Sequence, residues 1–283
     1  MSQPPTQIEF TIQPPKKWLS INWKELYRYR DLFIVLAWRD IAVRYKQTAL
    51  GVLWAIFQPI ITMVIFTFIF NWVAKIQSGD GTPYPIFLYV GQLFWIYFSN
   101  ALSNASNSMV ANAQLISKIY FPRLIVPATA ITTGLVDLGI SALVLVGMMI
   151  YYGFTPPLIG IAILPLLLLC VILCAMGMGL YMAAINVKYR DVRYALPFFI
   201  EIMKYVTPVI YPLKMLDAHP LAKTLMLWLN PMSGVISNAR AGLLGQSPIE
   251  WNTLGISFLM SLLFFIFGLY YFRNTERYFA DIV

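Results

Sequence analysis

The sequence predicts an all-α, polytopic membrane protein. Of its 283 residues, 59% are hydrophobic and only 11% are charged, whereas a soluble domain carries roughly a quarter charged residues. Apolar runs long enough to cross a ~30 Å hydrocarbon layer, about 20 residues as a helix, recur along the chain. We expect six transmembrane helices within a permease domain over 48–283, near residues 51–73, 85–111, 124–151, 158–186, 194–212 and 252–272.

The chain begins with a segment, residues 1–21, that we expect to be a flexible tail. It starts MSQPPTQIEF, which lacks the basic and then apolar order of a secretory signal. Its polar and proline-containing composition is typical of disordered segments. We therefore expect this tail to be retained.

Residues 22–47 have helical character but carry too many charges to span a membrane. Leu32–Trp38 give the helix an apolar face, and basic residues give it a polar one. Asp40 and Arg44 are four residues apart, the spacing of a helical ion pair. We expect a helix along the cytoplasmic interface, with cations directed toward phosphates. A plain membrane anchor is the alternative. The cations are Arg39, Arg44 and Lys46.

The basic residues are distributed unevenly between the two sides of the predicted membrane. Fifteen of the twenty lysines and arginines lie before the first span, in the loops after spans two and four, or in the C-terminal tail. By the positive-inside rule, both termini are cytoplasmic. The net charge of +8 therefore reflects topology, and we expect no nucleic-acid partner.

A short basic segment, SKIYFPRLIVP at 117–127, lies between the second and third spans. Lys118 and Arg123 would be costly inside lipid, whereas Ile119, Tyr120 and Phe121 are more apolar than a solvated loop requires. The segment predicts an amphipathic piece at the cytoplasmic surface that docks onto a partner. An interfacial turn anchored by the two cations is the alternative.

Residues 217–245 are too apolar for a freely solvated external loop. Asn230 can cap a helix, and Pro231 suits its first turn, so the segment divides there. Each piece has roughly a dozen residues, about 18 Å as a helix, which is too short to cross. We expect two short re-entrant helices. A single kinked span would place Arg273 and Arg277 outside, against the charge rule.

Three ionisable residues lie within the predicted spans: Asp137, Glu201 and Lys204. Charged groups at membrane depth are candidates for function. Glu201 and Lys204 are three residues apart, which predicts an ion pair facing the bundle interior, whereas the sequence identifies no partner for Asp137. A proton-coupled carrier usually has more such groups, so a secondary carrier is the weaker reading.

Other catalytic or metal chemistry has little support. Cys170 and Cys174 lie four apart in an apolar run, as packing residues do, and His219 is the single histidine. No G-x-x-x-x-G-K-[ST] motif is present, so this chain does not hydrolyse ATP through a phosphate loop. We expect no metal and no cofactor in the chain itself.

Aromatic residues make up 16% of the chain and form a stripe along the first span. Interfacial belts and lipid-facing rings account for many membrane aromatics. Sugar rings, however, stack their apolar C–H faces on aromatic rings, so an aromatic conduit with few charges suits a polysaccharide. The residues expected to line it are Phe57, Phe68, Trp72, Phe94, Trp95, Phe98, Phe199, Tyr205 and Tyr211.

Four segments together resemble one family. They are AWRDIAVRYKQTALGVLWAIFQP at 37–59, SKIYFPRLIVP at 117–127, NVKYRDVRYALP at 186–197, and VTPVIYPLKML with NPM inside 206–232. In their order and spacing they resemble the permease subunits of ABC-type polysaccharide exporters, which move O-antigen, capsule or teichoic acid chains.

This resemblance implies a homodimeric permease in the bacterial cytoplasmic (inner) membrane. Two copies of a separate cytoplasmic ATPase would bind ATP and Mg²⁺, and the substrate would be a polysaccharide on undecaprenyl pyrophosphate. Residues 113–121 would form the coupling helix. The implied sites are the coupling residues Ser117, Lys118, Tyr120, Phe121 and Arg123, the pyrophosphate-binding Arg39, Arg44 and Lys46, and the gate residues Asn230, Pro231 and Arg240.

Two other classes remain open at this point. One is a membrane-embedded glycan-assembly enzyme or scaffold, and the other is a secondary carrier. A neighbouring ATPase gene with a phosphate loop would favour the exporter. The residues do not separate O-antigen from capsule or teichoic acid, and O-antigen is the expected cargo.

Overall fold

The computed structural model describes residues 23–46, 52–189 and 191–276, and every regular element within them is a helix. The tail over 1–21 lies outside these residues. The elements are α1 (Trp23–Arg28), α2 (Arg30–Lys46), α3 (Val52–Phe66), the π-helix η1 (Thr67–Val73), α4 (Tyr84–Ala111), α5 (Ala113–Lys118), α6 (Ile125–Tyr152), α7 (Leu158–Lys188), α8 (Val192–Val206), the 3₁₀ helix η2 (Leu213–Leu216), α9 (Pro220–Leu229), α10 (Pro231–Leu244) and α11 (Trp251–Thr275).

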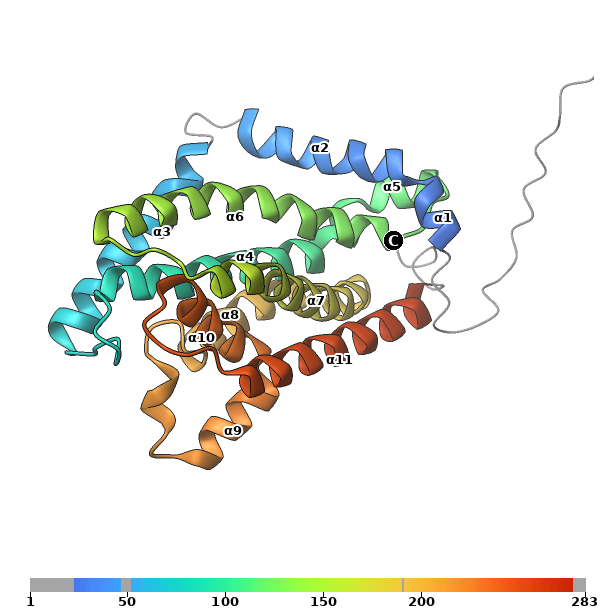
Figure 1. The fold of residues 1–283 in the computed structure, drawn as a ribbon. Coiled ribbons are helices and arrows are strands. Elements are labelled where there is room, and N and C mark those ends of the chain that lie inside the picture. The colour runs from blue at the N-terminus through green and yellow to red at the C-terminus, as the bar shows by residue number, and fades with distance from the viewer. Residues whose placement is uncertain (1–22, 47–51, 190, 277–283) are drawn as a thin grey trace, which may run out of the picture.

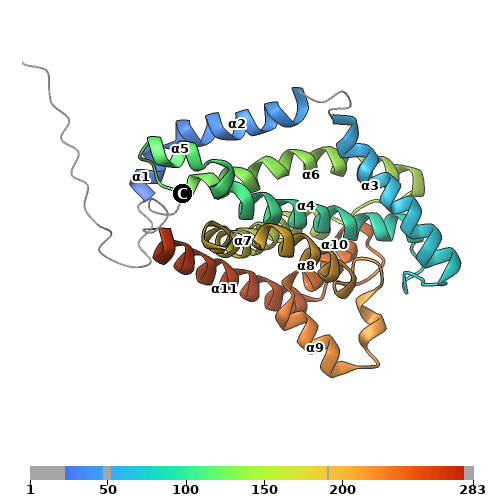
Figure 2. The ribbon, with the colours of Figure 1, turned by 180° about the vertical axis from the view of Figure 1, so that it is seen from behind.

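Five of these helices are long and apolar enough to cross a membrane: α3 continued by η1, α4, α6, α7 and α11. The four longest, α4, α6, α7 and α11, form the body of the protein, and α3 lies at one end of it (Figures 1 and 2). α4 and α7 are central, since α4 packs against α6 and α7, and α7 packs against α11. The predicted all-helical fold is therefore confirmed for the described residues, with five candidate membrane spans.

The prediction of a span over 194–212 is not confirmed. The corresponding helix, α8, has 15 residues and ends at Val206, which gives about 22 Å of helix, less than the ~30 Å hydrocarbon layer. Thr207 precedes Pro208 and has extended backbone angles, φ −72° and ψ 142°. Proline disfavours a helical conformation in the residue before it, so the helix ends there.

Glycines allow the central helices to approach closely. A Cβ atom on Gly268 of α11 would lie 1.9 Å from the carbonyl oxygen of Gly177 on α7. No side chain fits at that distance, so the two backbones touch directly, as small residues permit at membrane helix contacts. Gly177 and Gly268 therefore set the α7–α11 packing.

The main neighbour of α2 is α6, and the position of α2 along the cytoplasmic interface stays a prediction. α2 packs lengthwise along α6 (Figure 1). Leu36 is buried against a cluster that includes Phe121 and Phe272, whereas Trp38 is exposed. The sequence pattern showed a helix with an apolar face but not which neighbour that face would meet.

The predicted division at Asn230 is confirmed as a division into two helices. The Asn230 side chain accepts a hydrogen bond from the Met232 backbone N–H at 3.1 Å, and Pro231 is the first residue of α10. α10 is buried against α7, α11 and α4 over nearly its whole length, whereas most of α9 is exposed. Their depth in a membrane remains a prediction.

Candidate functional site

The first part of the candidate site is the connection from α5 to α6. α5 ends at Lys118, three residues earlier than predicted, and the chain then extends outward. Ser117 and Lys118 are exposed, as is Tyr120 at 64%. Phe121 is only 4% exposed and lies in the hydrophobic cluster with Phe272. Phe121 therefore anchors the loop. It was predicted to contact the partner, and its burial in this structure does not allow that.

Polar contacts tie this loop to both ends of the described chain. The Tyr120 hydroxyl donates to Glu25 of α1 at 3.3 Å, and Arg123 donates to the backbone carbonyl of Glu276. Arg273 of α11 also pairs with Glu276 at 3.1 Å. Burial raises the pKa of Glu276, and the two arginines oppose that shift. A force on the loop therefore reaches α1 and α11 directly.

The second part is the basic face of α2. Arg39 donates to Asp40 at 2.7 Å and to Asn112, which follows α4, at 2.9 Å. Arg44 forms an ion pair with Asp137 in the middle of α6, so the predicted pairing of Arg44 with Asp40 is wrong. Lys46 is exposed at the end of the helix.

Asp137 thus has the partner that the sequence could not identify. Besides Arg44, the hydroxyl of Tyr45 donates to the same carboxylate. The partners are separated by 93 and 92 residues, and no local spacing rule predicts a contact of that range. A carboxylate inside a predicted span, with several arginines on the preceding amphipathic helix, was the available signal.

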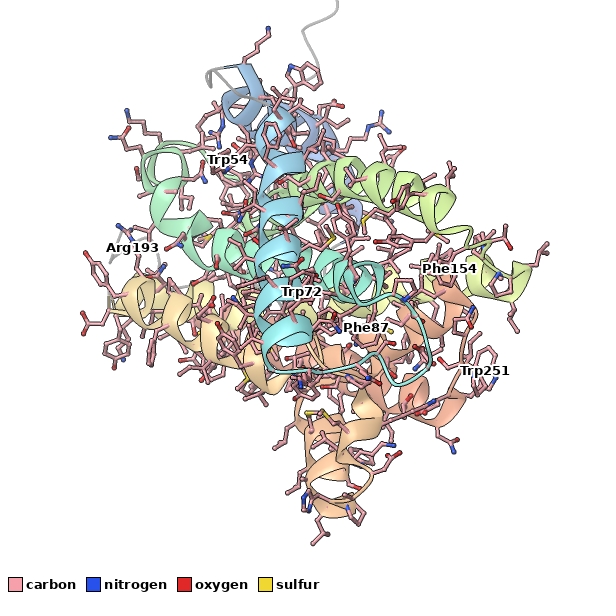
Figure 3. All side chains as sticks on the ribbon, turned by 90° about the vertical axis from the view of Figure 1, so that its left-hand side faces the viewer. Trp54, Trp72, Phe87, Phe154, Arg193 and Trp251 are labelled. Atoms are coloured by element: carbon pink, nitrogen blue, oxygen red, sulfur yellow. The ribbon has the colours of Figure 1, made fainter. Side chains whose placement is uncertain are left out.

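The third part is the aromatic stripe of α3 and η1. Phe57, Phe68 and Trp72 are 44%, 56% and 74% exposed. The rings of Phe68 and Trp72 lie 6.1 Å apart and border a shallow hollow that Met63 and Pro85 also line. Figure 3 shows this helix in front of the bundle, with Trp54 near its upper end and Trp72 near its lower end. The structure therefore presents the three rings on an accessible surface.

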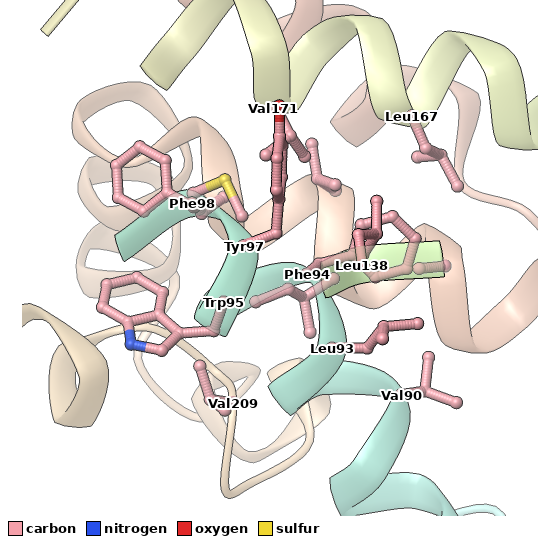
Figure 4. Packing of buried hydrophobic residues seen from close by; sticks show 14 of the residues in the cluster. Val90, Leu93, Phe94, Trp95, Tyr97, Phe98, Leu138, Leu167, Val171 and Val209 are labelled. Atoms are coloured by element: carbon pink, nitrogen blue, oxygen red, sulfur yellow. The ribbon is translucent and has the colours of Figure 1, made fainter. Parts of the chain in front are cut away.

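The aromatic residues of α4 do not belong to that surface. Phe94, Trp95 and Phe98 are 2%, 3% and 5% exposed, because they fill the core with Leu138 and Val209 (Figure 4). Their prediction as channel-lining residues is therefore wrong for this protomer. Large aromatic side chains contribute heavily to core packing, and their residue type alone did not show on which side of the helix they lie.

α8 adds a second accessible aromatic group. Phe199 and Tyr205 are about half exposed, and Tyr211 lies beyond the end of the helix, half-buried. Lys204 pairs with Glu201, as predicted, and its ammonium group lies 5.2 Å from the centre of the Phe66 ring. The end of α8 is therefore beside the junction of α3 and η1. Glu201 itself is exposed, so the pair does not face the protein interior.

The predicted gate residues are held by backbone contacts. Arg240 is 5% exposed and donates to the carbonyls of Phe87 at 3.0 Å, Pro208 at 2.7 Å and Val209 at 2.5 Å. Its guanidinium group lies 3.6 Å from the centre of the Phe87 ring. A Cβ atom on Gly91 would lie 2.4 Å from that group, so glycine is required there. Arg240 joins α10, α4 and the segment after α8.

Asn230 reinforces the same junction, because its amide donates to the Thr207 hydroxyl at 2.6 Å. Pro231 is buried at the start of α10. Asn230 therefore links the boundary between α9 and α10 to the point where α8 ends. Among the described residues, no group of three histidine, cysteine, aspartate or glutamate side chains could hold a metal ion.

The amino-acid sequence is similar to one protein family and to several proteins of known name. Residues 31–244 match the family described as ABC-2 type transporter. The chain is 28% identical over 253 residues to the O-antigen export system permease protein RfbA of Klebsiella pneumoniae, covering 89% of this chain and 95% of that protein. It is 29% identical to the RfbA protein of Myxococcus xanthus, covering 77% and 82%. It is 24% identical to the polysialic acid transport protein KpsM of Escherichia coli, covering 84% and 91%.

Proposed function

Because the chain belongs to the ABC-2 type transporter family, we propose that it is the permease subunit of an ATP-driven exporter of a lipid-linked polysaccharide. The membrane is the bacterial cytoplasmic membrane, both termini are cytoplasmic, and O-antigen is the expected cargo. Relatives named for O-antigen export and polysialic acid transport support a sugar polymer. The chain supplies conduit and gate, and a separate ATPase binds ATP and Mg²⁺.

The observation that carries this proposal is the exposed aromatic stripe of α3 and η1. Only 6% of this apolar segment is buried in the protomer, against 78% for α4. The rings of Phe68 and Trp72 are uncharged and can stack on the C–H faces of sugars. A second protomer facing this stripe would complete a conduit around the polymer, so we propose a homodimer as the working form.

The exposed loop after α5 is the proposed contact with the ATPase. Ser117, Lys118 and Tyr120 are exposed, and the buried Phe121 fixes the base of the loop. Tyr120 binds Glu25 of α1, and Arg123 binds Glu276 at the end of α11. A displacement of the loop would therefore be passed to both helices. Two permeases would engage two ATPase subunits.

The proposed headgroup site is the basic face of α2. Charge-assisted hydrogen bonds from arginine suit a pyrophosphate, and Arg39, Arg44 and Lys46 lie on the helix that precedes α3. In the structure Arg44 is bound to Asp137. A pyrophosphate that engages Arg44 would therefore compete with a carboxylate of this same chain.

The test of the proposal is export by variants of the aromatic stripe. The full chain is expressed with its ATPase in cells that lack the permease, and polysaccharide at the cell surface is quantified. Phe68→Ala and Trp72→Ala should reduce export while the amount of folded protein is kept. Val146→Ala, which changes an exposed apolar residue of α6 outside the stripe, is the control.

Cysteine labelling supplies an independent result. Cysteine at position 68 or 72 should react with a water-soluble reagent during transport. Normal export by both alanine variants, together with no labelling at either position, would show that the stripe faces lipid. The detergent-solubilised complex should contain two permease copies, and an active complex with one copy would exclude the homodimer.

A further inference from the structure

α4 changes character halfway along its length. Up to Phe98 it is apolar and buried, and from Ser99 onward one side of it is polar. Spacings of three and four residues place neighbouring side chains on one face of a helix. Over about 12 Å of helix, this face carries five partly exposed side chains: Ser99, Asn100, Ser103, Asn104 and Asn107. We call this face the polar track.

The hydrogen bonds of the polar track are incomplete. Asn107 is satisfied, since it accepts from Asn186 at 3.1 Å and donates to the Ser103 carbonyl at 3.0 Å. The side chains of Asn100, Ser103 and Asn104 make no hydrogen bond to any described residue. In lipid each such group would be left without a hydrogen-bond partner, which is strongly unfavourable. The three side chains therefore require polar partners other than the described residues of this chain.

The polar track lies between the other parts of the candidate site. At its cytoplasmic end, Asn112 accepts a hydrogen bond from Arg39 of the basic helix. At its other end, Asn100 shares a small cavity with Pro59 of α3 and with Asp137. Figure 2 shows α3 beside the N-terminal half of α4 and away from the half that leads to α5. The track therefore lies beside the basic helix, since Arg44 pairs with Asp137 at the Asn100 end, and that same end lies beside α3.

Resting on the proposed function, we propose that Asn100, Ser103 and Asn104 bind hydroxyl groups of the sugar chain in the cytoplasmic half of the conduit. Amide and hydroxyl groups donate and accept hydrogen bonds, as sugar hydroxyls do. α4 contains no charged residue, so it does not select an ionic group. A neutral hydrogen bond contributes little net free energy, so these contacts can be exchanged step by step as the polymer moves.

Other occupants fit this surface less well. Lipid chains would leave the three polar groups without partners. A second copy of the chain that covers them would satisfy the amides but exclude water, and the experiment separates that case. The test uses the full chain with its ATPase in membrane vesicles, after Cys170 and Cys174, both buried on α7, are replaced by alanine.

The first measurement is thiol labelling of Ser103→Cys by a charged, water-soluble methanethiosulfonate reagent. Leu143→Cys on α6 is the control, because Leu143 is 72% exposed on an apolar surface. Position 103 should react at least tenfold faster than position 143 with the charged reagent, while a lipid-soluble maleimide labels both. No reaction at position 103 with the charged reagent overturns the proposal, because lipid or protein then covers the track.

The second measurement is export by Asn100→Leu, Asn104→Leu and Asn104→Gln. Loss of one hydrogen bond predicts up to about a tenfold lower export rate for each leucine variant, and glutamine should restore most of it. A wild-type rate in both leucine variants overturns the polymer contact. A wild-type complex that moves no polysaccharide overturns the proposed function itself, so the two failures are distinguishable.

Discussion

Removal of the Arg240 side chain should cost substantial stability. Replacement by alanine leaves the carbonyls of Phe87, Pro208 and Val209 without their donor, and Arg240 is buried with them. An unsatisfied buried polar group costs about 1–3 kcal/mol. Partial relaxation and water entry reduce the summed cost of the three unsatisfied carbonyls. We therefore expect the free energy of unfolding to fall by about 3–5 kcal/mol.

The chain contains its own reporter for this measurement. Cys170 and Cys174 are fully buried on α7, so a thiol-reactive fluorogenic dye labels them only after unfolding. In a thermal scan of purified protein in detergent, Arg240→Ala should lower the midpoint by roughly 10 °C. Arg240→Lys keeps the positive charge, but lysine lacks the planar guanidinium group that donates to all three carbonyls. This variant should therefore recover only part of the lost stability.

Arg193→Ala is the matched control, since Arg193 is a basic residue on the exposed surface of α8. A surface change of this kind usually stays within about 0.5 kcal/mol. If Arg240→Ala and Arg193→Ala unfold at the same temperature, the carbonyl contacts do not stabilise the fold and the reasoning is wrong.

Three further predictions concern coupling, headgroup binding and packing. Tyr120→Asp should abolish export while the protein still inserts, and a cysteine at Ser117 should crosslink to the ATPase; normal export by the Tyr120 variant would contradict the coupling assignment. Arg44→Ala should reduce the ATPase stimulation measured on adding lipid-linked polysaccharide, whereas unchanged stimulation would leave Arg44 only its structural pairing with Asp137. Gly268→Leu should lower the unfolding midpoint in the same dye assay, because a Cβ atom there would lie 1.9 Å from a carbonyl oxygen of α7; an unchanged midpoint would show that the helices separate freely.

The sequence predicted those features that depend on local pattern. Runs of apolar residues identified five membrane-length helices, and Asn230 with Pro231 identified the boundary between α9 and α10, because capping and proline geometry act within a few residues. The span over 194–212 failed where Pro208 ends α8. The apolar composition extends beyond Pro208, whereas the helix ends before it.

The candidate site was less predictable, because most of it depends on which side of a helix faces inward. Phe68 and Trp95 are both aromatic residues in predicted spans, yet one is exposed and the other fills the core. The pairing of Arg44 with Asp137 joins segments 93 residues apart, which no local pattern encodes. Asn100 and Asn104 are polar residues in an apolar run, which is the local sequence signal for the polar track.

The sparse packing of α3 bears on how broad a range of polymers the conduit could accept. Among the described residues of α3, Pro59 alone is buried, and Ile60, Met63 and Phe66 pack against the core only partly buried, so an outward shift of α3 would break fewer contacts than a shift of α4 or α7. A wall of this kind yields to bulky or branched repeating units and distinguishes poorly between sugars of different width. Discrimination among glycans would then depend on the reducing-end lipid and its first sugars at the cytoplasmic side, and one permease could tolerate extensive variation in the repeat unit.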